Sequence, residues 1–321
     1  MLGSVIKATL VVALVPFLID LPAQPSVRAE ELLTTGAAPN ARVERVDGRE
    51  TVIATAGRAE DPALILIHGF GGSTFGWRNV MEPLAASGWF VVALDLPGFG
   101  LAEKRWGWPY DHRSQAKFVV AVMDQLSIST AVVAGHSMGG NVATWLAELE
   151  PERVRGLVLI DAAIATGSSG SPTATLLQLP PVRRAAQILI RSAFSEATFG
   201  ELLSSAFAVK SAATPDAIRG YAAASQLAEW DAALLGIIRD GSKNALPRPI
   251  ANIVSRNGTP IPTLILWGSN DTWVPIEAGE TLHANLPTAT YEVLPGLGHV
   301  PFEEDPEAFT LALQDWLDAL Q

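Results

Sequence analysis

The chain of 321 residues contains no cysteine. This absence excludes disulfide bonds, thiol catalysis and zinc sites built from cysteine, but it leaves the compartment open. Basic side chains are also scarce, because 22 Lys and Arg stand against 33 Asp and Glu and the net charge is −11. A nucleic-acid surface needs clustered Lys and Arg, so the composition argues against a nucleic-acid partner.

The N-terminus has one basic residue, Lys7, before the apolar run Ala8–Ile19. This run is too short to span a bilayer comfortably, and small residues at Val27 and Ala29 fit a cleavage site after Ala29. We therefore predict that residues 1–29 are a signal peptide of a secreted or periplasmic protein. The alternative is an uncleaved membrane anchor over residues 1–21, with the catalytic domain outside the cytoplasm in either case.

Apolar runs and helical patterns alternate along the rest of the chain. This alternation predicts an α/β protein with a mostly parallel sheet of about eight strands and helices on both faces. The predicted core comprises residues 30–162 and 258–321. Its expected strands are Arg42–Val46, Thr51–Ala56, Ala63–Ile67, Phe90–Leu94, Ala131–Ala134, Leu157–Ile160, Thr263–Trp267 and Tyr291–Leu294.

Residues 163–257 interrupt the alternation with helix-like segments rich in Ala and Leu. A long insertion at the functional edge of a sheet is usually a lid, so we predict a helical cap over the carboxyl ends of the strands. Some of its helices could instead cover the sheet directly. Its large apolar residues could line a substrate pocket or form the cap's own core: Leu176, Leu179, Ile188, Phe194, Phe207 and Trp230.

The segment VVAGHSMGGNVA, residues 132–143, places Ser137 between Gly135 and Gly139 at a strand-to-helix turn. G-x-S-x-G is the spacing of a nucleophile elbow, although a serine that merely caps the helix would look the same. A serine nucleophile needs a base within hydrogen-bond reach and a third group that orients the base. The motif therefore requires partners elsewhere in the chain.

His299 is the candidate base, because it lies in a glycine-containing loop after the last strand. Asp271 is the candidate acid, since it follows the strand that ends at Trp267 and completes the order Ser, acid, His. Asp271 could instead cap the next helix, and Asp161 is then the reserve acid. An oxyanion hole is expected from the backbone N–H groups of Phe70, in HGFGG, and Met138, after the nucleophile.

Five motifs in register resemble the α/β-hydrolase superfamily: HGFGG, DLPGFG, GHSMGG, WGSND and GHVPFEE. The resemblance implies the serine-nucleophile branch, because epoxide hydrolases and haloalkane dehalogenases carry aspartate at the elbow. GHSMGG is similar to carboxylesterases and monoacylglycerol-lipase-like enzymes. The C–C bond hydrolases of aromatic-ring degradation are also similar, but they commonly carry G-N-S-M-G-G and a tryptophan after the catalytic histidine. His136 and Val300 depart from that pattern.

The resemblance implies a serine hydrolase of the carboxylesterase or lipase type, acting on a small-molecule ester and needing no metal or other cofactor. Candidate substrate contacts are Gly69, His136, Trp230 and Val300. Two alternatives stay open: a C–C bond hydrolase of a vinylogous diketone, and a non-catalytic ligand receptor on the same scaffold. The sequence does not indicate the oligomeric state.

Overall fold

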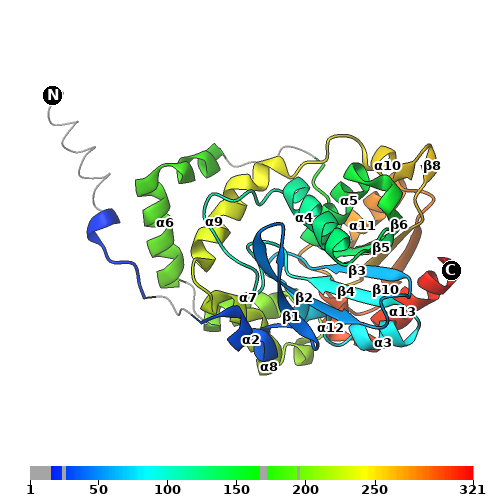
Figure 1. The fold of residues 1–321 in the computed structure, drawn as a ribbon, viewed down its shortest axis with the longest axis horizontal. Helices are drawn as coiled ribbons and strands as arrows, with labels where there is room; N and C mark the ends of the chain where they lie inside the picture. The colour runs from blue at the N-terminus through cyan, green and yellow to red at the C-terminus, as the bar shows by residue number, and fades with distance from the viewer. Residues whose placement is uncertain (1–15, 24–26, 167–171, 194–195, 321) are drawn as a thin grey trace.

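A sheet of eight strands lies at the centre of the computed structural model, which describes residues 16–23, 27–166, 172–193 and 196–320 (Figure 1). The strand order is β1-β2-β4-β3-β5-β6-β9-β10. The bounds are β1 (Ala41–Val46), β2 (Arg49–Ala56), β3 (Ala63–Ile67), β4 (Phe90–Leu94), β5 (Ala131–His136), β6 (Val154–Ile160), β9 (Thr263–Gly268) and β10 (Thr290–Leu294). Every predicted strand is present, extended by up to three residues at an end.

The sheet is antiparallel at one edge and parallel elsewhere. β1 and β2 form a hairpin, β2 pairs antiparallel with β4, and all other pairs are parallel. The hairpin turns through Asp47 and Gly48, both with positive φ, as a type I′ turn requires. The parallel strands β3, β4 and β5 are buried throughout because helices cover both faces. The predicted fold class is confirmed.

Two layers of helices bury the two faces of the sheet (Figure 1). One layer contains α4 (His112–Gln125), α5 (Met138–Leu149) and α11 (Ile276–Asn285), and the other contains α3 (Met81–Ala86) and α13 (Pro306–Leu320). Shorter elements are α2 (Ala29–Gly36), η1 (Thr74–Trp77), η2 (Pro151–Arg153) and α12 (Pro301–Glu304).

The chain between β6 and β9 is mainly helical, and its part up to Asp240 lies beyond one end of the sheet in Figure 1. Its elements are η3 (Pro172–Gln178), α6 (Pro180–Ala193), α7 (Glu196–Ala206), η4 (Lys210–Ala212), α8 (Pro215–Ala222), η5 (Ala223–Gln226), α9 (Trp230–Asp240), η6 (Gly241–Lys243) and α10 (Ile250–Ile253). A short hairpin of β7 (Ser255–Arg256) and β8 (Thr259–Pro260) follows. α10 packs into the core with α5 and α11, so this end of the insertion covers the sheet rather than the site.

Buried polar contacts tie the insertion to the core. Glu303 of α12 forms an ion pair with Arg78 and accepts a hydrogen bond of 3.0 Å from the hydroxyl of Tyr221 in α8. Within the insertion, Arg191 of α6 pairs with the buried Asp231 of α9 at 2.9 Å. The contacts of Glu303 therefore join α8 to the core, and the Arg191–Asp231 pair joins α6 to α9.

The predicted signal peptide or anchor falls mostly outside the described residues, which begin at Pro16. Among the helices that the structure describes, none combines the length and the hydropathy needed to cross a bilayer. The described segment 16–23 lies beside α6, where Arg184 donates hydrogen bonds to the carbonyl oxygens of Pro16 and Ile19.

Candidate active site

Ser137 occupies a sharp turn between β5 and α5. Its backbone has φ 50° and ψ −118°, which is a rare conformation for a residue other than glycine, and its N–H donates to the carbonyl of Ile160 at 2.8 Å. The flanking glycines make the turn possible. A Cβ atom on Gly135 would lie 2.2 Å from the carbonyl oxygen of Gly139, and one on Gly139 would lie 2.4 Å from that of Ile67. The geometry is that of a nucleophile elbow.

His299 and Asp271 meet in the loops that follow β10 and β9. The Nδ1 atom of His299 lies 2.7 Å from Oδ2 of Asp271, and both residues are buried. The other oxygen of Asp271 accepts hydrogen bonds from the backbone N–H groups of Trp273, at 2.7 Å, and Val274, at 3.0 Å. Asp271 therefore closes a turn with Oδ1 while Oδ2 contacts the imidazole. It does not cap the next helix, because the N-cap of α11 is Pro275 and has no side-chain cap hydrogen bond.

His136 connects the elbow to the loop of His299 through a hydrogen bond. Its Nε2 atom donates to the carbonyl oxygen of His299 at 2.7 Å, and the two rings lie 4.8 Å apart. Burial lowers the pKa of His136 well below its usual value, so the ring is neutral. The backbone N–H of His299 also donates to Ala206 at the end of α7, at 2.9 Å. His299 is thus held by His136 on one side and by the end of α7 on the other.

No hydrogen bond joins the Ser137 hydroxyl to the His299 ring, and both residues are among those described. Nucleophile–base hydrogen bonds are often long without substrate and shorten when substrate binds. His136, the residue before Ser137, lies against His299, with the two ring centroids 4.8 Å apart.

The two predicted oxyanion donors come from the loop after β3 and from the first residue of α5, Met138. Within the described chain, the backbone N–H groups of Phe70 and Met138 have no backbone acceptor. Gly69 brings the Phe70 loop close, because a Cβ atom on Gly69 would lie 3.0 Å from Cβ of Ser137. His68 holds the same loop, since its Nδ1 donates to the Gly69 carbonyl at 2.7 Å and its Nε2 accepts from Leu96 at 3.0 Å.

The His68 ring is neutral in this arrangement. Burial lowers its pKa to about 4, and the acceptor role of Nε2 requires an unprotonated nitrogen there. His68 therefore positions the Phe70 loop.

A largely apolar cavity opens beside the base and the Phe70 loop. Gly69, His136 and Val300, three of the four predicted substrate contacts, line this cavity. The fourth, Trp230, instead lines an adjoining cavity that shares Phe70, Gly71, Phe199 and Tyr221 with the first. The cavity beside His299 is also lined by Leu202, Leu203, Ala206, Trp273 and Phe302.

Sequence reasoning missed the cap residues that line the cavity. Leu176 and Leu179 are exposed, Phe207 is buried in the core beside α7, and Phe194 lies outside the described residues. The lining comes instead from α7 through Phe199, Leu202, Leu203 and Ala206. The spacing i, i+3, i+4, i+7 marks one face of a helix, and this periodicity was the available signal.

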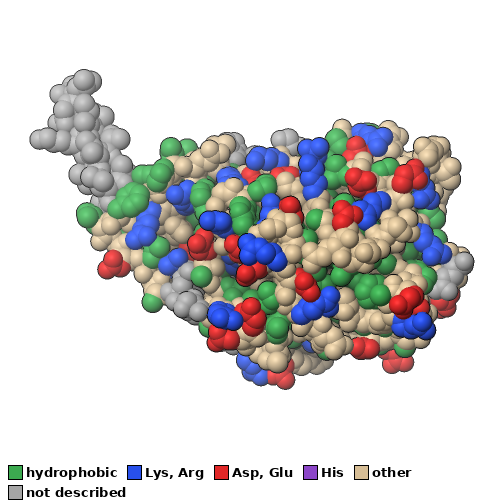
Figure 2. Space-filling model, viewed as in Figure 1, with side chains coloured by type: hydrophobic (Ala, Val, Ile, Leu, Met, Phe, Trp, Pro, Cys, Tyr) green, Lys and Arg blue, Asp and Glu red, His purple; other side chains and the backbone are tan. Residues whose placement is uncertain are grey.

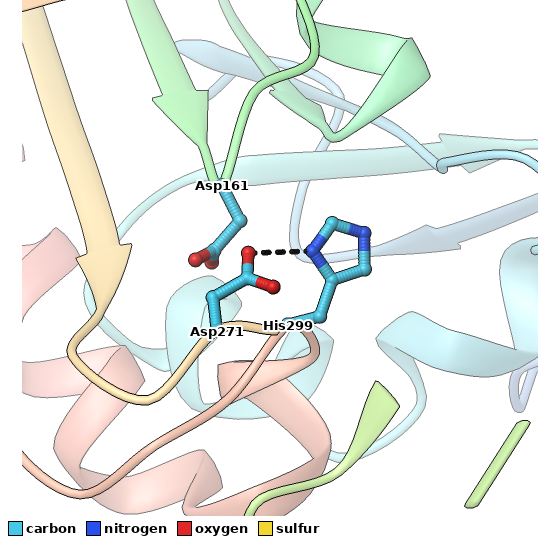
Figure 3. Close-up of side chains that lie close together, drawn as sticks. All are labelled: Asp161, Asp271 and His299. Carbon is cyan, nitrogen blue, oxygen red and sulfur yellow. Dashed lines mark hydrogen bonds and ion pairs between the residues drawn. The ribbon is translucent and has the colours of Figure 1, made fainter. Parts of the chain in front are cut away.

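Asp161, the reserve acid, lies at the end of β6 next to Asp271 (Figure 3). One ligand atom from each of Asp161, Asp271 and His299 lies within 4.8 Å of the other two. Burial, and next the charge of Asp271, raise the pKa of Asp161 well above its usual value. A metal ion there would compete with the hydrogen bond between His299 and Asp271, so the arrangement does not resemble an open metal site.

Comparison with known proteins places the chain among hydrolases. It is 30% identical over 254 residues to the uncharacterized hydrolase YugF of Bacillus subtilis, covering 79% of this chain and 89% of that protein. It is 27% identical over 260 residues to the 2-hydroxy-6-oxononadienedioate/2-hydroxy-6-oxononatrienedioate hydrolase of Cupriavidus pinatubonensis, covering 79% and 86%.

Among solved structures, a membrane phospholipase A described as a bacterial virulence factor superposes with a TM-score of 0.70 and 26% identity. The superposition covers 99% of this chain and 97% of that one. Residues 62–306 match the family model of the alpha/beta hydrolase fold, a range that contains the strands β3 to β10, the elbow and both loops of the site. The predicted resemblance is confirmed, and this protein is a hydrolase of the α/β-hydrolase family.

Proposed function

We propose that this protein is a serine hydrolase that cleaves carboxylic esters with an apolar acyl group. The observation that carries the proposal is the combination of the strained Ser137 elbow with the buried His299–Asp271 pair. Gly69, which lies against Ser137, and His299 both line a largely apolar cavity. A serine hydroxyl needs such a base and orienting acid to attack a carbonyl carbon at neutral pH.

In the proposed mechanism, Ser137 attacks the acyl carbon while Nε2 of His299 accepts the hydroxyl proton. Asp271 holds the ring through Nδ1 and stabilises the imidazolium that forms. The N–H groups of Phe70 and Met138 stabilise the oxyanion, each contributing about 3 kcal/mol. His299 then protonates the leaving alcohol and activates the water that releases the acyl group from Ser137.

The cavity lining favours an ester over the substrate of the C–C hydrolase relatives. The Cupriavidus relative acts, by its name, on a dienedioate, which carries two carboxylates. Among the described residues that line the cavity beside His299, none is Lys or Arg, and Lys104 in the adjoining cavity donates to the carbonyl oxygens of Gly100 and Ala102. A site for a dianion would leave its charge without a cationic partner there, at a high cost in desolvation. The membrane phospholipase A, an ester hydrolase by name, lends further support.

The test is hydrolysis of p-nitrophenyl esters of graded chain length by the full-length protein in detergent, beside Ser137→Ala. We expect turnover that is lost in the variant and that increases with acyl length. A 2-hydroxy-6-oxo-dienedioate is assayed in parallel. Faster turnover of the dienedioate would replace the ester proposal with the C–C hydrolase alternative, and turnover of neither by a folded protein would favour the ligand-receptor alternative.

For location, we propose that the N-terminal segment stays attached and holds the enzyme at a membrane with its catalytic domain outside the cytoplasm. Phe17, Leu18 and Ile19 are exposed beside α6, whose Leu189 is 69% exposed. Figure 2 shows apolar side chains gathered at this end of the molecule. The hydrogen bonds from Arg184 to this segment would be lost on cleavage, which supports retention over a cleaved signal peptide.

The mass of the mature protein tests this location. A membrane-fraction protein that keeps residues 1–29, and that external protease degrades in intact spheroplasts, would agree with the anchor. A protein that begins at Glu30 in the soluble extracytoplasmic fraction would show instead that the segment is a signal peptide.

A further inference from the structure

Two buried carboxyl groups lie side by side behind the candidate base. Asp161 follows β6 and Asp271 follows β9, and these strands are parallel neighbours in the sheet. Figure 3 shows the carboxyl group of Asp161 beside that of Asp271, on the side away from the His299 ring. Asp161 is fully excluded from solvent.

The hydrogen bonds of the pair leave one oxygen without a donor. Asp271 accepts from Trp273 and Val274 through Oδ1 and from His299 through Oδ2. Asp161 accepts from the backbone N–H of Gly268 through Oδ1 at 2.8 Å. Its Oδ2 atom is buried and has no donor among the described residues. An ionised carboxylate oxygen in that position would be costly, because neither water nor a donor reaches it.

The surrounding charges increase that cost. The carboxylates of Asp271 and Glu304 both disfavour a negative charge on Asp161. His299 and Tyr291 on β10 are further titratable groups nearby. The carboxylate of Glu304 accepts hydrogen bonds from the backbone N–H groups of Gly298, Ala208 and Val209. Two like charges this close in a buried site share a proton.

We propose that Asp161 is protonated in the active enzyme and donates its proton in a hydrogen bond to Asp271, so that the carboxyl pair carries a single negative charge. Asp161 is then a positioning residue. Its O–H and the Nδ1–H of His299 both point at the Asp271 carboxylate, which fixes the plane of that carboxylate and hence of the imidazole. This inference rests on the proposed roles of Ser137, Asp271 and His299.

The pair of variants Asp161→Asn and Asp161→Ala tests the proposal. Asparagine reproduces a protonated carboxyl group, because its Oδ1 can accept from Gly268 and its Nδ2 can donate to Asp271. Alanine removes both groups. We expect kcat for an ester to fall about tenfold or more in Asp161→Ala, and Asp161→Asn to recover most of this loss with an unchanged acidic limb of the pH profile. Asp318→Asn, on the exposed face of α13, is the matched control.

A second readout does not depend on activity. Infrared difference spectra of wild type against Asp161→Asn at pH 7 should contain the carbonyl band of a buried protonated carboxyl group, sensitive to deuterium, which is absent for Asp318→Asn. If no ester is hydrolysed, the proposed function fails while this band still decides the state of Asp161.

Three outcomes would overturn the proposal. The first is absence of the infrared band. The second is a displacement of the acidic limb by about one pH unit or more in Asp161→Asn, since loss of a true negative charge at this distance has that effect. The third is a change of wild-type activity on treatment with a chelator that magnesium or zinc reverses, because a cation would then hold the two carboxylates.

Discussion

The Nδ1 atom of His299 and the Oδ2 atom of Asp271 are joined at 2.7 Å, although 28 positions of sequence separate the two residues. β9 and β10 pair in parallel with Trp267 opposite Val293 and Gly268 opposite Leu294, so their following loops leave the sheet at the same edge. Gly268 allows the close approach, because a Cβ atom there would lie 2.1 Å from the carbonyl oxygen of Gly298.

Asp271→Asn should lower kcat for an ester by about 10⁴-fold with the fold intact. Asparagine keeps the acceptor for Trp273 and Val274, but it loses the charge and favours the wrong imidazole tautomer. Steady-state kinetics beside the exposed Asp315→Asn would measure the effect, and circular dichroism would verify folding. A loss smaller than tenfold would mean that Asp271 does not orient the base.

Ser137→Gly should be more stable than Ser137→Ala by about 1 kcal/mol, with both variants inactive. The positive φ of residue 137 costs energy for any side chain, whereas glycine adopts it readily. Urea denaturation of the two variants gives the difference in unfolding free energy. Equal stabilities would indicate that the elbow relaxes when the hydroxyl is removed.

His112→Gln should make the unfolding free energy less sensitive to acid. Burial lowers the pKa of His112 to about 4, and its Nδ1 accepts from the amide of Asn141 at 2.6 Å. Between pH 6.5 and 4, His112 is protonated in the unfolded chain but stays neutral in the folded chain. The contribution to stability is therefore present above pH 6.5 and is lost as the pH falls.

The size of this effect follows from the shift in pKa. Between pH 7 and pH 5 the wild type should lose about 2 kcal/mol more stability than His112→Gln. Urea titrations of both proteins at the two pH values would give the change in unfolding free energy of each. Subtracting the change in the variant from that in the wild type cancels the contributions of other titratable groups such as Asp95. A parallel loss in both proteins would contradict a neutral, buried His112.

Leu203→Trp should shorten the preferred acyl chain. Leu203 is buried in α7 and lines the cavity beside His299, so the larger ring fills space that a long chain would use. We expect kcat/KM for an octanoyl ester to fall about tenfold or more relative to an acetyl ester. Leu311→Trp, at an exposed position of α13, controls for the substitution itself, and an equal change in both ratios would place the acyl site elsewhere.

Local sequence patterns predicted the sheet, the elbow and the candidate triad. Continuous apolar runs such as Ala63–Ile67 indicate strands buried on both faces, and Asp47-Gly48 specifies its hairpin turn. The glycines around Ser137 are required by atoms within a few residues or on the adjacent strand. These features depend on short-range sterics, so the sequence predicts them without knowledge of the folded structure.

The tertiary structure alone decided what surrounds those residues. The proximity of Asp161 to Asp271 depends on β6 and β9 being neighbours in the sheet although a hundred residues of insertion, roughly, separate them. Likewise, α7 lines the cavity while Leu176 and Leu179 face solvent, because the packing of the cap on the core selects which apolar helix face meets the site. Apolar periodicity indicates that a face is buried, but the partner of that face is determined by long-range contacts.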